Sequence, residues 1–137
     1  MEETIYPEIR RILAPNPSPM TFTGTNTYLI GHEEIAVIDP GPKSVPHLNA
    51  ILRAIKPGSQ ITKIFVTHSH LDHSPLAAAL SEKTNAKIYA YGDSFSGRSI
   101  EMNKLAKNNS IGGGEGVDAN FQPDISLIAV SYTHLRA

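Results

Sequence analysis

The positions of apolar residues along the chain predict short strands that alternate with helices. Two β-prone runs, residues 27–30 and 35–38, are separated by a four-residue polar segment that is typical of a hairpin. Residues 61–67 form the strongest strand candidate, because apolar residues follow one another at its centre, as in a strand covered on both faces. Further strands are expected over residues 9–13, 87–91 and 125–130.

Amphipathic segments between these runs predict helices. Ser44 can cap the first helix, whose apolar residues recur on one face until Pro57 ends it. Pro75 opens a second helix, and a third short one is expected over residues 100–107. The order strand, strand, helix, strand, helix, strand is typical of an α/β domain in which helices cover a mixed sheet.

The remaining segments predict loops and a tail. Prolines at every second position make residues 15–19 an extended, exposed loop, and the glycine-rich stretch after Asn108 has no apolar period. The last residues show neither a helix signal nor a turn. We therefore expect one domain over residues 1–129 and an unstructured, non-native tail over residues 130–137.

Composition narrows the function classes. The 137 residues suffice for one domain, and a hydrophobic content of 40% supports an ordinary globular core. The absence of cysteine excludes disulfides, cysteine nucleophiles and cysteine-ligated zinc. A net charge of -1 provides no overall field that would recruit nucleic acid or an anionic membrane. Without a signal peptide or a long apolar run, we expect a cytoplasmic protein without a membrane partner.

Metal-binding residue types cluster directly after the strongest strand, in the segment THSHLDH. If that segment is extended, His68 and His70 project to the same side and can hold one metal ion. Asp72 and His73 lie beyond the strand and can turn toward a second ion, about 3.5–4 Å from the first in two-metal sites. Imidazole and carboxylate ligands suit zinc, with iron or manganese as alternatives. The alternative is a surface loop with unrelated histidines, or histidines that are hydrogen-bonded within a core. His32 and His47 are expected to be solvated.

The blocks TGTNTYLIG, AVIDPGP and THSHLDH together resemble the metallo-β-lactamase superfamily of metal-dependent hydrolases. The longer segments NPSPMTFTGTNTYLIG and THSHLDHSPLA are most similar to its glyoxalase II and β-lactamase-like protein 2 branch, which is hydroxyacylglutathione-hydrolase-like. The resemblance covers roughly residues 9–128. It implies the N-terminal part of a four-layer αβ/βα sandwich, truncated here, with metals at the edge between two sheets.

The resemblance also implies roles for individual residues. His68 and His70 would bind a first zinc ion, and Asp72 and His73 a second. Asp72 would in addition be catalytic, by orienting the attacking hydroxide. Asp39 would lie behind the ligands and orient them, although an Asp before proline is also a common turn residue.

Thr67 is expected to end the strand, and contact with a metal ligand is its less favoured role.

Departures from the family pattern narrow the set of possible reactions. His70 stands where the redox di-iron branch has Glu, and the lack of cysteine disfavours the true β-lactamases. Ser74 and Pro75 replace the glycine pair of glyoxalase II. The family's third His, bridging Asp and final His are absent, and His134 is not assigned as a ligand.

The leading hypothesis is a zinc-dependent hydrolase that uses two ions and a metal-bound hydroxide to cleave an ester or thioester of a small molecule. A single-strand endoribonuclease of the same superfamily, acting on RNA, is the second hypothesis. A third is that the chain is an inactive metal-binding fragment without the C-terminal ligands. The oligomeric state has no signature in the sequence.

Overall fold

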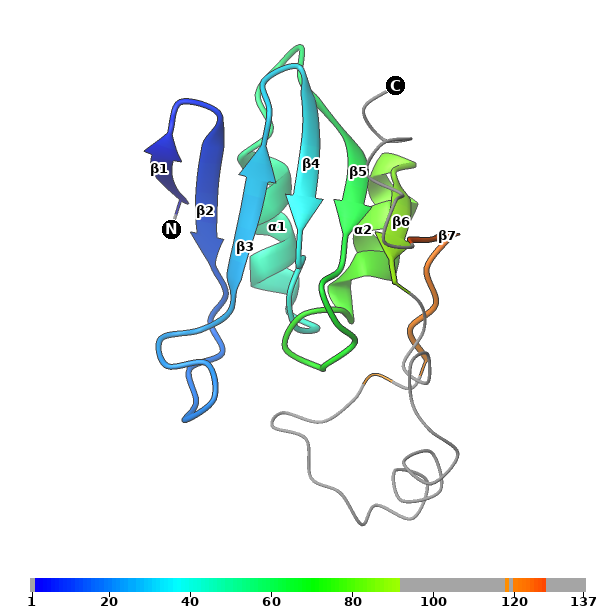
Figure 1. Cartoon of the computed structure of the whole chain (residues 1–137). Coiled ribbons are helices and arrows are strands. Elements are labelled where there is room, and N and C mark those ends of the chain that lie inside the picture. The colour runs from blue at the N-terminus through cyan, green and yellow to red at the C-terminus, as the bar shows by residue number, and fades with distance from the viewer. Residues whose placement is uncertain (1, 92–117, 119, 128–137) are drawn as a thin grey trace.

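The computed structural model describes residues 2–91, 118 and 120–127. Its framework is one sheet of seven strands that lie side by side in chain order (Figure 1). The strands are β1 (Glu2–Tyr6), β2 (Ile9–Leu13), β3 (Asn26–Ile30), β4 (Glu34–Ile38), β5 (Gln60–Phe65), β6 (Lys87–Ala90) and β7 (Ile125–Ser126). The helices are α1 (Val45–Arg53), between β4 and β5, and α2 (Leu76–Thr84), between β5 and β6.

The sheet is mixed because its two halves are connected differently. Strands β1 to β4 run antiparallel to their neighbours and are joined by turns or loops without an intervening helix. From β4 onward each strand runs parallel to the next, and α1 and α2 supply the crossovers that the first two parallel connections need. The carboxyl ends of β4 and β5 therefore meet at the same edge of the sheet.

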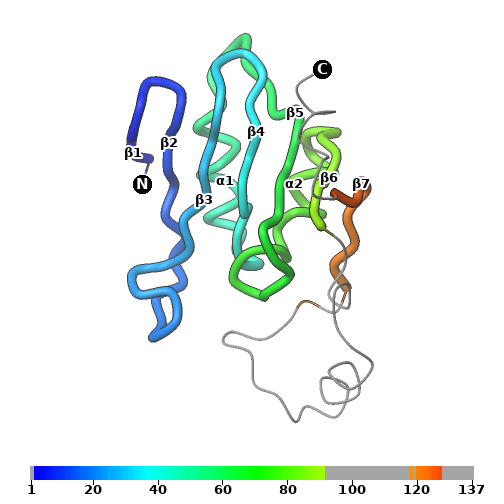
Figure 2. The backbone as a smooth tube through the Cα atoms, in the orientation of Figure 1, coloured from blue at the N-terminus to red at the C-terminus, as the bar shows by residue number. Residues whose placement is uncertain are grey.

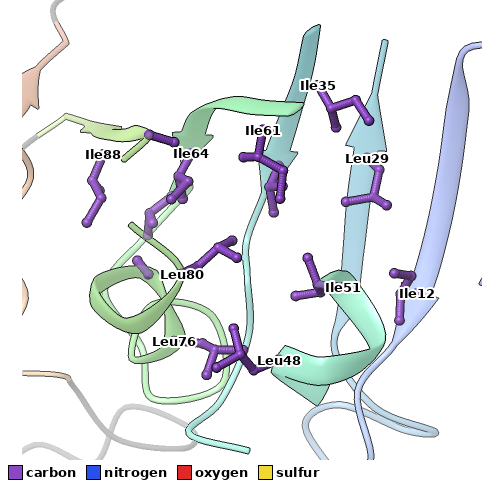
Figure 3. Close-up of a cluster of buried hydrophobic side chains, with 14 of the residues drawn as sticks. Ile12, Leu29, Ile35, Leu48, Ile51, Ile61, Ile64, Leu76, Leu80 and Ile88 are labelled. Atoms are coloured by element: carbon purple, nitrogen blue, oxygen red, sulfur yellow. The ribbon is translucent and has the colours of Figure 1, made fainter. Parts of the chain in front are cut away.

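Both helices pack on one face of the sheet, where they enclose the apolar core (Figures 2 and 3). Leu48 and Ile51 of α1 point toward the sheet. Leu76 and Leu80 of α2 point toward the same face of the sheet, next to the α1 residues. The strands contribute Ile12, Leu29, Ile35, Val37, Ile61, Ile64 and Ile88 to this core. Burial of these side chains is the main force that holds the helices against the sheet.

The opposite face of the sheet carries a second row of apolar side chains. Strand register places Tyr28, Ile38, Phe65, Tyr89 and Ile125 next to one another across five strands. The rings of Phe65 and Tyr89 stack with their centroids 5.2 Å apart. Within the described ranges no helix covers this row, and its side chains are half-buried. Helices therefore cover only one face of β5 in the described part of the chain, whereas its sequence predicts a strand that is covered on both faces.

The predicted α/β class and most predicted elements are confirmed. The Oγ of Ser44 accepts a hydrogen bond from the backbone N of His47 at 3.2 Å, which makes Ser44 the N-cap of α1. Strand β5 ends at Phe65, two residues earlier than predicted, and β1 was not predicted. The expected helix at 100–107, the domain boundary at 129 and the tail at 130–137 lie outside the described residues. No helix in the described part of the chain is long and apolar enough to cross a membrane.

Candidate metal centre

Two loops form the candidate site at the sheet edge where β4 and β5 end (Figure 1). The first loop contains Asp39 and Gly41, and the second contains the histidine cluster. The backbone N of Gly41 donates to the carbonyl of His73 at 3.0 Å, and the N of Leu76 donates to the carbonyl of Gly41 at 3.2 Å. These bonds fix the loops to each other at the strand carboxyl ends, where open α/β sheets commonly bind ligands.

Three side chains bring metal-ligand atoms together. One ligand atom each from His68, Asp72 and His73 lie within 4.8 Å of one another. The Nε2 of His73 is 3.1 Å from Asp72 Oδ2, and the ring centroids of His68 and His73 are 4.1 Å apart. Two imidazoles and a carboxylate at this separation can converge on one ion.

His70 stands beside this group, and the structure does not pair the four predicted ligands as the sequence analysis did. The rings of His68 and His70 are neighbours, with centroids 4.6 Å apart and planes at 82°, but His70 does not belong to the set of three. The carbonyl of His70 accepts hydrogen bonds from the backbone N of His73 and of Ser74. The turn closed by these bonds carries Asp72 and His73 back toward His68.

Asp39 lies directly behind the histidines. Its Oδ1 accepts a hydrogen bond from the backbone N of Thr67 at 2.8 Å, and its Oδ2 accepts one from the Thr67 hydroxyl at 2.7 Å. The same Oδ2 lies 2.9 Å from Nδ1 of His73. Asp39 is thereby buried behind a candidate ligand, and Thr67 contacts both Asp39 and His68.

The hydrogen bonds determine which ring nitrogens point away from the protein framework. A carboxylate only accepts, so His73 donates from Nδ1 to Asp39. The Thr67 hydroxyl uses its one proton on Asp39, so its oxygen accepts from Nδ1 of His68 at 2.9 Å. Both rings therefore carry the Nδ1 proton on the framework side and leave Nε2 for another partner, as in metal-binding histidines.

The two histidines differ in their electrostatic surroundings. Burial lowers the pKa of His73, but hydrogen bonds and charges from Asp39 and Asp72 outweigh it and raise that pKa above its ordinary value. Burial, followed by the neighbouring His73 and His70, lowers the pKa of His68. The surroundings thus favour the charged form of His73, which lies between two carboxylates, and the neutral form of His68.

A further contact fixes the histidine loop from its other side. The backbone N of Asp118 donates to the carbonyl of Ser69 at 2.7 Å, and the Ser74 hydroxyl donates to Asp118 Oδ2 at 3.2 Å. Asp118 follows a glycine-rich stretch with no apolar period, and no local pattern associates it with the site.

The structure corrects the expectation that His47 is solvated. His47 is 1% exposed, whereas the apolar Val45, two residues earlier in α1, is 69% exposed. The Nε2 of His47 lies 2.8 Å from the hydroxyl of Thr27, which is also buried. Its position four residues before the core residue Ile51 was the signal that could have revealed this orientation.

The donor set fits a borderline metal ion such as zinc. Two imidazoles with Nδ1 held by hydrogen bonds and one adjacent carboxylate are ligand types that zinc accepts. In the metal-free protein, His73 needs a proton on Nε2 to face the Asp72 carboxylate at 3.1 Å, and a cation would take the place of that proton. His134 lies outside the described residues.

Comparisons with known proteins agree with the fold and the motif. A family model described as the Metallo-beta-lactamase superfamily matches residues 20–96. The Beta-lactamase-like protein 2 homolog of Drosophila melanogaster is 39% identical over 92 residues, which are 60% of this chain and 30% of that protein. The Atrochrysone carboxyl ACP thioesterase of Passalora fulva is 38% identical over 74 residues, which are 53% of this chain and 22% of that protein. The chain therefore spans less than a third of the length of these two curated relatives.

Solved structures show the same architecture at low identity. A subclass B3 metallo-beta-lactamase of Bradyrhizobium japonicum superposes with a TM-score of 0.58 and 17% identity, over 93% of this chain and 45% of that one. A metallo-beta-lactamase from Cronobacter sakazakii gives a TM-score of 0.58 at 18% identity, over 93% and 47% of the two chains. These likenesses concern the fold, whereas the family model matches the sequence itself over more than half of the chain. The chain belongs to the metallo-beta-lactamase superfamily.

Proposed function

We propose that the complete protein is a metal-dependent hydrolase that cleaves an ester or thioester of a small molecule. His68, Asp72 and His73 would hold zinc, with His70 beside them as the fourth ligand and room for a second ion in the complete site. One observation carries the proposal: two imidazoles are oriented by Asp39 and Thr67 so that their Nε2 atoms are left for a ligand next to a carboxylate.

Each of these residues has a distinct task in the proposed reaction. When bound, zinc lowers the pKa of water and polarises a carbonyl group. Asp39 keeps the His73 ring in the orientation that exposes Nε2, and Thr67 does the same for His68. Asp72 accepts a hydrogen bond from the attacking water and directs it at the carbonyl carbon. This second task makes Asp72 the proposed catalytic residue.

An acyl substrate is favoured over RNA by two observations. A curated relative from Passalora fulva is named as a thioesterase that acts on an acyl carrier protein substrate. The net charge of -1 offers no general attraction for a polyanion. S-lactoylglutathione and single-stranded RNA, offered side by side to the complete protein, separate the two possibilities. Cleavage of RNA alone would contradict the thioester proposal.

The mechanism is tested by Asp72→Ala in the complete protein. We expect the substitution to remove most of the hydrolysis of S-lactoylglutathione or a related thioester while leaving the circular dichroism spectrum unchanged. Glu82→Ala, which removes an exposed carboxylate from α2, is the matched control and should keep full activity. Undiminished hydrolysis by folded Asp72→Ala protein would rule out the proposed role.

A further inference from the structure

A buried polar pair lies between α1 and the sheet, outside the candidate ligands. His47 of α1 and Thr27 of β3 are 1% and 0% exposed, and the His47 Nε2 is 2.8 Å from the Thr27 hydroxyl. The Thr27 hydroxyl in turn donates to the main-chain carbonyl of Asp39 at 2.7 Å. The pair thus ends on the residue that orients His73.

The protons along this path are determined by the partners. Thr27 has one hydroxyl proton, which it gives to the Asp39 carbonyl, so its oxygen accepts from Nε2–H of His47. His47 therefore carries a proton on Nε2. Its Nδ1 is buried without a hydrogen-bond partner among the described residues, which agrees with burial lowering the pKa of His47 to about 4.

The pair acts on a strained piece of backbone. Asp39 has φ +53°, in the left-handed region that is unfavourable for a residue with a side chain. Two hydrogen bonds hold the main chain of Asp39. Its N donates to the carbonyl of Phe65 at 2.8 Å, and its carbonyl accepts from the hydroxyl of Thr27. Loss of the second bond would free the Asp39 carbonyl from this restraint and allow its conformation to relax.

The ring of His47 also supports the turn that follows Asp39. A Cβ at Gly41, which has φ +100°, would lie 3.0 Å from Cδ2 and 3.1 Å from Nε2 of His47. The ring is therefore packed against the backbone of the same turn. Gly41 donates from that turn to the carbonyl of His73, so the turn contacts the candidate ligand by main chain as well as by the Asp39 side chain.

We propose that Thr27 and His47 are positioning residues that hold Asp39 in its left-handed conformation, so that its carboxylate keeps the His73 ring oriented for metal binding. The effect on metal affinity rests on the function proposed above, whereas the effect on the His73 ring exists in the metal-free protein. Substitution of residues that hold a ligand indirectly typically costs metal affinity about 10–100-fold.

The first experiment observes the metal-free chain by NMR of the histidine ring nitrogens. In the wild type, Nδ1 of His73 should carry a proton in a strong hydrogen bond to Asp39. Thr27→Val should abolish that signal, and Thr27→Ser, which keeps the hydroxyl, should retain it. His47→Leu and His47→Gln form a second pair, since glutamine can still donate to Thr27.

The second experiment measures the affinity for Co²⁺ alone by competition with a chromophoric chelator. Thr27→Val and His47→Leu should weaken binding about tenfold or more, while Thr27→Ser and His47→Gln stay within a few-fold of the wild type. Ile51→Val is the matched control, because it loosens the packing of α1 without touching Asp39 and should leave both readouts unchanged.

The outcomes distinguish this inference from the proposed function. An unchanged His73 signal in folded Thr27→Val and His47→Leu proteins overturns the inference, as would an equal effect of Ile51→Val. If the wild type and all variants fail to bind Co²⁺ but the His73 signal responds as predicted, the positioning role stands and the metal-dependent function fails.

Discussion

At the scale of single residues, Asp39 connects the two loops of the candidate metal centre. Its two carboxylate oxygens accept three hydrogen bonds, from the main chain and side chain of Thr67 and from His73. A charged acceptor behind an imidazole orients the ring and increases the basicity of the nitrogen that faces a metal. The carboxylate thus affects both candidate histidine ligands without binding a metal itself.

Substitution of this carboxylate tests that account. In Asp39→Asn one carboxylate oxygen becomes an NH2 group, which donates and cannot accept, so either the backbone N of Thr67 or the Thr67 hydroxyl and His73 lose their acceptor. We expect zinc affinity to fall about 10–100-fold, as measured by competition with a chelator. Asp124→Asn, which alters an acid bonded to the backbone of β6 away from the ligands, serves as the control. Equal affinity of Asp39→Asn and the wild type would contradict the orienting role.

His47 predicts a pH dependence of folding stability. Burial lowers its pKa from 6.5 to about 4, so the unfolded chain binds a proton at higher pH than the folded one. The contribution of neutral His47 to the free energy of unfolding is complete above the pKa of the unfolded chain. It is lost as the pH falls from that value toward the folded pKa, and the free energy of unfolding decreases by about 2 kcal/mol between pH 7 and pH 5. Urea unfolding of the wild type should show this loss, and His47→Gln should show less of it. Parallel pH profiles of the two proteins would contradict the prediction.

At the scale of elements, the strand ends and helix starts position the site. Strands β4 and β5 deliver Asp39 and the histidine loop to one edge because they are parallel neighbours. Helix α1 begins at Val45, and its N-cap Ser44 follows the first loop directly and holds the backbone N of His47 by a hydrogen bond. The start of α1 is therefore structurally coupled to the loop that carries Asp39.

Removal of the cap should destabilise the domain measurably. Ser44→Ala deletes the side-chain acceptor for the backbone N of His47 and should lower the free energy of unfolding by about 1 kcal/mol. Ser44→Asp supplies another N-cap acceptor and should restore most of the loss. Urea denaturation measures both. A neutral Ser44→Ala substitution would indicate that the cap bond contributes nothing.

Local patterns predict the elements better than they predict the site. Ser44, the prolines and the apolar runs identify α1 and strands β2 to β6 because capping and periodicity are local properties. Strand β1 was not predicted because its residues, such as Glu2 and Tyr6, are exposed and form no apolar pattern. His47 was misplaced because its burial depends on Thr27, a partner 20 residues away.

The grouping of ligands depends on a turn that the spacing of histidines does not specify. Period-two alternation correctly brings His68 beside His70, but it cannot show that the carbonyl of His70 closes a turn with His73. That turn places Asp72 and His73 next to His68. The side-chain types were therefore predictable from the motif, whereas their arrangement required the tertiary structure.

At the scale of the whole molecule, the sheet has one face covered by α1 and α2 and one that no described helix covers. The second face carries the apolar row from Tyr28 to Ile125, including the stacked rings of Phe65 and Tyr89. A contiguous apolar face of this kind is rare on a monomer that exposes it to water. Such faces mark sites where another layer of protein packs.

The 137-residue chain by itself should therefore bind a hydrophobic dye and associate as its concentration rises. Phe65→Ser together with Tyr89→Ser should reduce dye fluorescence and the sedimentation coefficient at high concentration, because these side chains lie on the open face. Val45→Ser, at an exposed position on α1, is the control. Equal dye binding by the double variant and the wild type would place the exposed apolar surface elsewhere.

Calorimetric titration of the chain with Zn²⁺ near neutral pH examines whether His68, Asp72 and His73 form a metal centre. We expect saturable binding to the wild type, a loss of at least about tenfold in affinity for His68→Ala, Asp72→Ala and His73→Ala, and no change for His32→Ala in the hairpin turn. Absence of binding to folded wild-type protein, or binding unaffected by all three substitutions, would contradict this expectation.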